Sequence, residues 1–243
     1  MIAIYKKEIS IFFSTIIGPL IIGLFLLVNG LLLWSDLSSV NILDNSYASM
    51  DTFFFVSPLM FLFFISAISM STFSAEYSSG NIENLITKPI SLFQIIIGKF
   101  LAIMTFVFIA VVPTFLYILT IYFLGETSGN LDMAGIFGSY IGLFLLSSIF
   151  ASIGVFSSAL TDNQIVSFVL AIIISIIFYY GFDLLSKVDF FKSIDIILQN
   201  FGISYHYNFM SKGLLRGSDI FYFISVSGLF LKFCEFVILR KVK

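Results

Sequence analysis

Six long apolar runs dominate the sequence and limit what the chain can fold into. They cover residues 11–34, 52–74, 100–124, 133–160, 165–182 and 220–239, and the first five contain no Asp, Glu, Lys or Arg. A helix rises about 1.5 Å per residue, so roughly 20 apolar residues cross the hydrocarbon core of a bilayer. With 59% apolar and 11% charged residues, the chain also lacks the polar surface of a soluble domain. We therefore predict an all-α integral membrane protein with six transmembrane helices, forming one domain over residues 1–243.

The positions of Lys and Arg predict how these helices are oriented, because cytoplasmic loops retain positive charge during insertion. One side of a six-helix arrangement carries Lys6, Lys7, Lys88, Lys99, Arg240, Lys241 and Lys243. The first two loops on the opposite side contain no Lys or Arg but carry Asp36, Asp44, Asp51, Glu126 and Asp132. The third opposite loop, residues 183–219, contains both signs and fits less well. We predict that both termini are cytoplasmic.

That third loop has the pattern of a short amphipathic helix. Apolar residues recur at helical spacing from Phe190 to Phe201, polar residues take the other face, and Gly202 is placed to end the helix. Tyr205, Tyr207 and Phe209 follow, as is typical of an aromatic belt at a membrane interface. We predict outer interfacial or re-entrant helices here, although a plain amphipathic cap on the loop explains the pattern equally well.

Several residues predict how the apolar helices bend and pack. Proline lacks the N–H donor of a helix, so Pro113 and the pair Gly18-Pro19 should bend the third and first runs. The short connection Thr161–Gln164 predicts a tight antiparallel hairpin between the fourth and fifth runs. Small residues at four-residue spacing in the fourth run predict close packing inside this chain rather than at a subunit interface. These pairs are Gly138 and Gly142, Ser147 and Ala151, and Gly154 and Ser158.

Groups that could carry chemistry inside the membrane are scarce. Lys232 and Glu235 lie three residues apart in the last run, which favours a snorkelling ion pair over a proton relay. Cys234 is expected to be a small buried apolar residue. His206 has no nearby cysteine or acidic pair at metal-ligand spacing, so we expect a surface or interfacial imidazole. The sequence therefore predicts no metal site.

Neither catalysis nor nucleic-acid binding is expected of this chain. The segment Gly98-Lys99-Phe100 has the Gly-Lys pair of a nucleotide-binding loop, but Phe93 stands where the first glycine should be and no Ser or Thr follows. The net charge of −2 gives no basic surface for nucleic acid. We predict that the chain is not an enzyme and binds no cofactor directly.

The loop over residues 75–94 is the one sizeable feature on the predicted cytoplasmic side. Gly80 permits a turn, Asn81 can cap a helix, and the pattern stops near Pro89. Between them an apolar edge at i, i+3, i+4 spacing is formed by Ile82, Leu85 and Ile86. This predicts one short amphipathic helix. It is either solvated on its polar face, which is the simpler interpretation, or docked by its apolar edge in a groove of another protein.

The residues of this loop resemble the signature of type-2 ABC transporter permeases. The matching segments are Ala75-Glu76-Tyr77-Ser78-Ser79-Gly80-Asn81-Ile82-Glu83-Asn84-Leu85-Ile86-Thr87-Lys88-Pro89-Ile90 and Ile97-Gly98-Lys99-Phe100-Leu101-Ala102. Asn81 replaces the usual threonine of that family but retains its capping ability. The resemblance implies a coupling helix over residues 80–89 that contacts a partner ATPase. The implied contact residues are Glu76, Gly80, Asn81, Ile82, Glu83, Leu85, Ile86, Lys88 and Pro89.

A narrower resemblance, to the GldF family of gliding-motility ABC permeases, covers nearly the whole chain. It is carried by Tyr5-Lys6-Lys7-Glu8-Ile9, Asn41-Ile42-Leu43-Asp44, Gly138-Ser139-Tyr140-Ile141-Gly142-Leu143, Ser157-Ser158-Ala159-Leu160-Thr161-Asp162-Asn163-Gln164-Ile165-Val166 and Tyr179-Tyr180-Gly181-Phe182. One departure is Lys232-Phe233-Cys234-Glu235, which is more charged than the apolar end that the family has. The resemblance implies an interfacial elbow helix over residues 2–12, with Tyr5, Lys6, Lys7 and Glu8.

The same resemblance implies partners and a location. Cytoplasmic ABC ATPase subunits of the GldA kind would bind ATP and Mg, and a second membrane subunit of the GldG kind would pair with this chain. The assembly would be a multi-pass protein of the bacterial inner, or cytoplasmic, membrane.

Three functions follow from these patterns. The first is the permease subunit of an ATP-driven ABC-2 exporter, which couples ATP hydrolysis by partner ATPases to movement of the membrane helices. The second is a stand-alone channel or carrier, against which the scarcity of intramembrane polar groups and the lack of an evident inverted repeat count. The third is a membrane scaffold that holds partners without transport.

Overall fold

A computed structural model describes residues 1–35, 41–42, 49–82, 90–125 and 131–242, and every regular element in these ranges is helical. The long apolar runs form α1 (Ile2–Ser14), α2 (Ile17–Trp34), α3 (Asp51–Ser69), α6 (Leu92–Val111), α7 (Phe115–Leu124), α8 (Met133–Leu160), α9 (Gln164–Ile176) and α13 (Gly217–Val242). Five helical stretches are long and apolar enough to cross a membrane, or six if α1 and α2 count as one bent span. The prediction of an all-α chain with several membrane helices is confirmed, while the orientation of the termini stays a prediction.

The first apolar run is divided between two helices. α1 and the part of α2 that starts at Gly18 meet at an angle of 71°, and Thr15 between them has an extended backbone. Proline clashes with the carbonyl four residues before it, and for Pro19 that residue is Thr15. The predicted bend is therefore confirmed, and it divides the apolar run predicted as the first span, because residues 11–14 belong to α1.

Two other runs change their helix geometry before they end. α3 ends at Ser69, and the short α4 (Ser74–Ser78) follows after a turn. Pro113 lies in a 3-10 turn, η1 (Val112–Thr114), between α6 and α7. The whole stretch Leu92–Leu124 nevertheless remains one candidate span. Pro113 thus alters the helix locally without ending the span.

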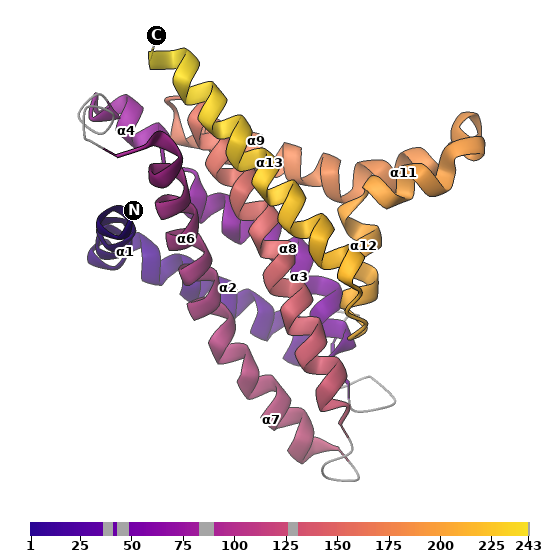
Figure 1. Cartoon of the computed structure of the whole chain (residues 1–243). Helices are drawn as coiled ribbons and strands as arrows, with labels where there is room; N and C mark the ends of the chain where they lie inside the picture. Colours follow the sequence, from indigo (N-terminus) through magenta and orange to yellow (C-terminus); the bar gives the residue numbers. More distant parts are fainter. Residues whose placement is uncertain (36–40, 43–48, 83–89, 126–130, 243) are drawn as a thin grey trace.

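α8 is the central helix, and α3, α6, α9, α12 (Ile203–Met210) and α13 all pack against it (Figure 1). A Cβ atom added at Gly138 would lie 2.8 Å from the carbonyl oxygen of Gly213, in the turn that follows α12. One added at Gly142 would lie 2.5 Å from Cβ of Met210. The close packing predicted for the small residues of this run is confirmed, and its contacts lie inside the chain.

The connection between α8 and α9 is as short as predicted. α8 ends at Leu160 and α9 begins at Gln164. The side-chain oxygen of Asn163 accepts hydrogen bonds from the backbone N–H groups of Ile165 and Val166. These bonds satisfy donors that a helix start leaves free, so the tight turn has a local cause.

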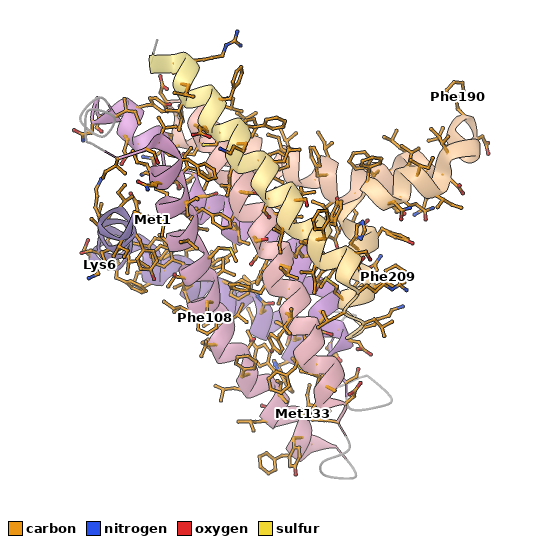
Figure 2. All side chains as sticks on the ribbon, in the orientation of Figure 1. Met1, Lys6, Phe108, Met133, Phe190 and Phe209 are labelled. Carbon is orange, nitrogen blue, oxygen red and sulfur yellow. The ribbon has the colours of Figure 1, made fainter. Side chains whose placement is uncertain are left out.

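Beyond α9 the chain forms an arm that extends away from the bundle (Figure 1). α9 passes through one π-helical turn, η2 (Ile177–Gly181), into α10 (Phe182–Ser186), η3 (Asp189–Ile194) and α11 (Asp195–Phe201). Phe190 lies at the tip of the arm in Figure 2 and is 85% exposed. The helix predicted over Phe190–Phe201 is thus a 3-10 stretch followed by an α-helix, and Gly202 ends it as expected.

α12 corrects two predictions. Tyr207 is buried rather than interfacial, and its hydroxyl donates to the carbonyl oxygen of Phe54 at 2.8 Å. Burial raises the pKa of Tyr207 well above its usual value, so this hydroxyl stays protonated. His206 is also buried rather than on the surface. Its Nδ1 lies 2.8 Å from Asp219 Oδ1 and its Nε2 lies 2.9 Å from the carbonyl oxygen of Asn200.

α13 contains the predicted ion pair of the last run. Lys232 Nζ lies 2.8 Å from Glu235 Oε2. The same ammonium group stands 3.9 Å from the ring centroid of Phe93 on α6, so this charge also helps to attach α13 to its neighbour. Cys234 is fully buried, as predicted, and its thiol faces the backbone of α8 at Val155.

Candidate functional site

The segment predicted to contact a partner follows α4, and its described start, residues 80–82, lies at the same end of the bundle as the C-terminus (Figure 1). The structure describes its first part: Gly80 has a φ of 68°, which fits the predicted turn, and Ile82 is 9% exposed. The side-chain amide of Asn81 donates to Ser79 Oγ at 3.0 Å. The remaining predicted contact residues, Glu83, Leu85, Ile86, Lys88 and Pro89, fall outside the described residues.

A buried lysine lies beside α4, which leads into this segment. Lys99, on α6, is 1% exposed. Its ammonium group donates to Glu8 Oε1 at 2.8 Å and to the carbonyl oxygen of Thr72 at 2.6 Å, and it lies 3.0 Å from Glu76 Oε1. These partners come from α1, from the turn between α3 and α4, and from α4 itself. One side chain on α6 therefore joins α1 and the region from the α3–α4 turn to α4, which are distant from one another in the sequence.

The charges of this group are balanced. Lys7 Nζ lies 3.3 Å from the same Glu76 oxygen, so two ammonium groups face the two carboxylates of Glu8 and Glu76. The Lys99 ammonium also stands 4.9 Å from the ring centroid of Phe73. A buried charge is tolerated only when it is paired and hydrogen-bonded, and Lys99 meets both conditions. We refer to Lys7, Glu8, Glu76 and Lys99 as the ionic cluster.

α1 packs closely enough on α6 for Glu8 to reach the ionic cluster. A Cβ atom added at Gly98 would lie 3.2 Å from the backbone oxygen of Met1, so the glycine permits this approach. The side chain of Ile4 is buried there, and the hydroxyls of Tyr5 and Thr105 lie 3.0 Å apart. The pair Gly98-Lys99 therefore has a structural use: the glycine admits α1 and the lysine binds it.

A serine of α8 holds the start of α4. Ser158 Oγ accepts hydrogen bonds from the backbone N–H groups of Phe73 and Ser74, at 2.9 and 3.0 Å, and donates to the carbonyl oxygen of Met70 at 2.9 Å. The break between α3 and α4 would otherwise leave buried backbone groups without partners. The central helix thus fixes the position of α4.

The last turn of α13 reaches the same end of the molecule. Lys241 Nζ lies 3.1 Å from Asp162 Oδ1 in the turn between α8 and α9. It also stands 4.1 Å from the ring centroid of Tyr77 on α4. α4 is therefore in contact with charged groups from both the first and the last helix of the chain.

The structure brings together some of the residues singled out in the sequence and separates others. Glu8, Lys7 and Glu76 meet in the ionic cluster, whereas Lys6 points away from the bundle (Figure 2). The sequence patterns missed the role of Lys99, which was counted only as a loop charge. A signal existed, because Lys99 is the sole charged residue between Lys88 and Glu126. An isolated charge in an apolar helix requires a partner.

The ionic cluster can pass a displacement from one helix to another, but it contains no reactive group. Every carboxylate in it is held by an ammonium group, and no nucleophile lies among its members. Within the described ranges, no three His, Cys, Asp or Glu residues are grouped so as to hold a metal ion. The chemistry of this site is therefore ionic contact between helices that flank the predicted docking segment.

Comparison with known families decides what kind of membrane protein carries this arrangement. The family model described as "ABC-2 family transporter protein" matches residues 3–234. The chain belongs to the ABC-2 transporter family. No curated protein matches it. ABC-2 proteins are the membrane subunits of ABC exporters and work with separate ATPase subunits. In this ABC-2 subunit, α4 contacts charged groups of α1, α6 and α13 at the start of the segment that was predicted to meet a partner.

Proposed function

We propose that this ABC-2 subunit couples ATP hydrolysis by partner ATPases to movement of its membrane helices through residues 76–90. The observation that carries the proposal is the ionic cluster. Glu76 begins this segment, and Lys99 connects it to α1, to the turn after α3 and to α6. A displacement of the segment would therefore act on these helices together instead of bending a free loop.

The docking contact is assigned to the apolar edge predicted for this segment. Leu85 and Ile86 would fill a groove on the ATPase, and Glu83 and Lys88 would orient the contact. Ile82, the third residue of that edge, is buried by this chain itself and would anchor the segment at its start. The movement requires two packing arrangements of the helices, of which the nucleotide state of the ATPase favours one.

The partners follow from the resemblance to the GldF family. We assign a GldA-like ATPase, which binds ATP and Mg, and a GldG-like second membrane subunit, assembled in the bacterial inner membrane. The fold supports this with α1, which lies across the start of α2 at 71° as an interfacial elbow helix would. Tyr5, Lys6, Lys7 and Glu8 belong to this helix, and two of them enter the ionic cluster.

The docking contact is tested by co-purification of the tagged chain with the ATPase. Leu85→Asp places a charge on the apolar edge and should remove most of the ATPase from the purified complex. Thr87→Asp is the matched control, because two residues on a helix are about 200° apart and the same charge then lies on the polar face. Undiminished ATPase with Leu85→Asp, or equal loss in both variants, would refute this contact.

The coupling step needs a different measurement. Glu76→Gln removes one carboxylate from Lys99 and leaves Glu8 in place, so the complex should still assemble. A coupling free energy of about 1–3 kcal/mol predicts a change of roughly fivefold or more in the ATPase rate of the reconstituted complex. An unchanged rate in an intact complex would contradict coupling through the cluster and favour a membrane scaffold instead.

A further inference from the structure

A large cavity lies away from the ionic cluster, between α2, α3, the arm and α12. Its volume is about 920 Å³. Cavities that bind small molecules in proteins have volumes of about 300–1,000 Å³, so this one is large enough for an extended organic ligand. Its lining joins the start of α3 to the π-helical turn and α10, which places it in the half of the bundle opposite to α4 (Figure 1).

One part of the cavity is apolar and only partly covered. α3 contributes Phe55, Val56 and Leu59, and Phe55 is 78% exposed although Phe53 and Phe54 before it on the helix are buried. From the opposite wall the π-helical turn contributes Tyr179 and Tyr180, whose rings meet at a centroid distance of 4.6 Å. Turns of this kind are frequent at functional sites in helices. This part of the cavity matches a flexible apolar chain.

The other part carries charges of both signs. Asp51, at the first residue of α3, and Lys212, in the turn after α12, both line the cavity. They also line a smaller adjoining cavity of about 200 Å³, so both stand where the two cavities meet. Neither forms an ion pair with another residue in the ranges that the structure describes. The third charged residue of the lining, Asp183, is already held by Lys187 at 2.7 Å.

We propose that this cavity binds one zwitterionic amphiphile, with its apolar chain between α3 and the π-helical turn and its head group between Asp51 and Lys212. The ammonium group of Lys212 would receive a phosphate-like anion, and the carboxylate of Asp51 would receive an amine. Burial of the chain supplies affinity through the apolar surface removed from water, and the two charges select the head group. The site does not depend on the coupling proposed above.

The first experiment measures selection between head groups. The full-length chain, purified in detergent with its partner subunits, is titrated with phosphatidylethanolamine or with phosphatidylglycerol of the same acyl chains, and bound lipid is counted by native mass spectrometry. Phosphatidylethanolamine should bind as one molecule and about tenfold more tightly, which corresponds to about 1.4 kcal/mol. Equal binding of the two lipids, or binding of many molecules without preference, would overturn the proposal.

Variants then locate the bound lipid. Val56→Trp should fill the apolar part and abolish the single bound molecule, whereas Val169→Trp, on the exposed face of α9 outside the cavity, should leave it unchanged. Asp51→Lys should shift the preference toward phosphatidylglycerol, because two cations then face the head group. Lys6→Glu, an exposed charge change on α1, is its control. The proposal is wrong if Val56→Trp retains the lipid in a protein that elutes like the wild type.

A last arm identifies the source of the amphiphile. ATP turnover in the complex should release a transported molecule and leave a resident membrane lipid in place. In both cases the amphiphile must first bind in this cavity. The lipid titration that measures this binding uses no ATP. A failure of the coupling function and a failure of this binding site are therefore distinguishable.

Discussion

At the scale of single residues, Lys99 and Ser158 decide how the end of the bundle around α4 is held. Both are buried, and both satisfy groups from other elements. The stability that each contributes depends less on its own hydrogen bonds than on the buried groups that would lose their partners if it were replaced. A buried group without its partner costs more than the bond contributed.

Lys99→Met should destabilise the protein strongly. Met is unbranched and nearly as long as Lys, but it leaves the partly buried carboxylate of Glu8 without its ammonium partner and that of Glu76 with Lys7 alone. Removing one partner of a buried ion pair costs up to about 3–5 kcal/mol. The double variant Lys99→Met with Glu76→Gln should recover part of this loss. Thermal unfolding in detergent measures both, and equal stability of the single variant and the wild type would show that the cluster contributes little.

Ser158→Ala should cost about 1–3 kcal/mol, because the backbone N–H groups of Phe73 and Ser74 lose their acceptor. Its neighbour supplies the control. Ser157 Oγ is buried and has no hydrogen-bond partner among the described residues, so Ser157→Ala should be neutral or stabilising. Denaturation of the two variants side by side tests this, and the reverse order of stability would contradict the assignment.

At the scale of elements, the packing of α8 depends on glycines where backbones meet. Gly138 faces the backbone of Gly213, whose φ of 77° is itself one that favours glycine. Flexible side chains can move aside for a new methyl group, whereas a backbone of this kind cannot. Small residues at regular spacing in an apolar run indicate such contacts for the same reason.

Gly138→Ala should therefore destabilise the bundle by about 1–3 kcal/mol, since overpacking displaces the turn after α12. Gly228, on α13, has open space where a new methyl group would lie, so Gly228→Ala should stabilise its helix by up to about 1 kcal/mol. Unfolding midpoints of the two variants give the comparison. Equal effects would mean that helix propensity, and not the close approach, dominates at Gly138.

The arm is fixed to the bundle by a polar contact at its base. Asn200 offers only a carbonyl oxygen to His206 Nε2, so that nitrogen donates, and Nδ1 lies 2.8 Å from Asp219 Oδ1. The ring of His206 also stacks on that of Tyr222, whose hydroxyl donates to the carbonyl oxygen of Phe201. α11, α12 and the first turn of α13 are thereby joined.

At the scale of the whole molecule, the two proposed sites lie at opposite ends of the bundle. The role of each site therefore depends on which end of the bundle faces the cytoplasm. In the predicted orientation, residues near the ionic cluster face the cytoplasm and the head-group end of the cavity faces outward. The ATPase would then act on one end and the amphiphile would be bound toward the other.

Labelling with a membrane-impermeant maleimide tests this orientation. Single cysteines replace Lys212 or Lys6, both exposed, in a Cys234→Ala background. In intact cells Lys212→Cys should react at once, and Lys6→Cys should react only after the membrane is permeabilised. The opposite pattern would show that the chain has the inverse orientation. Reaction of both cysteines in intact cells would contradict a cytoplasmic N-terminus.

The sequence by itself determined that the chain is a membrane protein, where its apolar helices lie, and where they bend or end. Runs of apolar residues, the prolines at 19 and 113, and the short turn Thr161–Gln164 act within a few residues of themselves, so a linear pattern records them. The family assignment to ABC-2 transporters rests on the same local signals extended over the chain.

Only the tertiary structure decided the partners of buried polar groups. Lys99 meets Glu8, which is 91 residues away, and Tyr207 meets Phe54, which is 153 residues away. The burial of His206 likewise depends on Asp219 in another helix. A pattern along the chain says that a charge or a hydroxyl needs a partner, but its identity is set by which helices pack side by side, because desolvation acts on the assembled bundle.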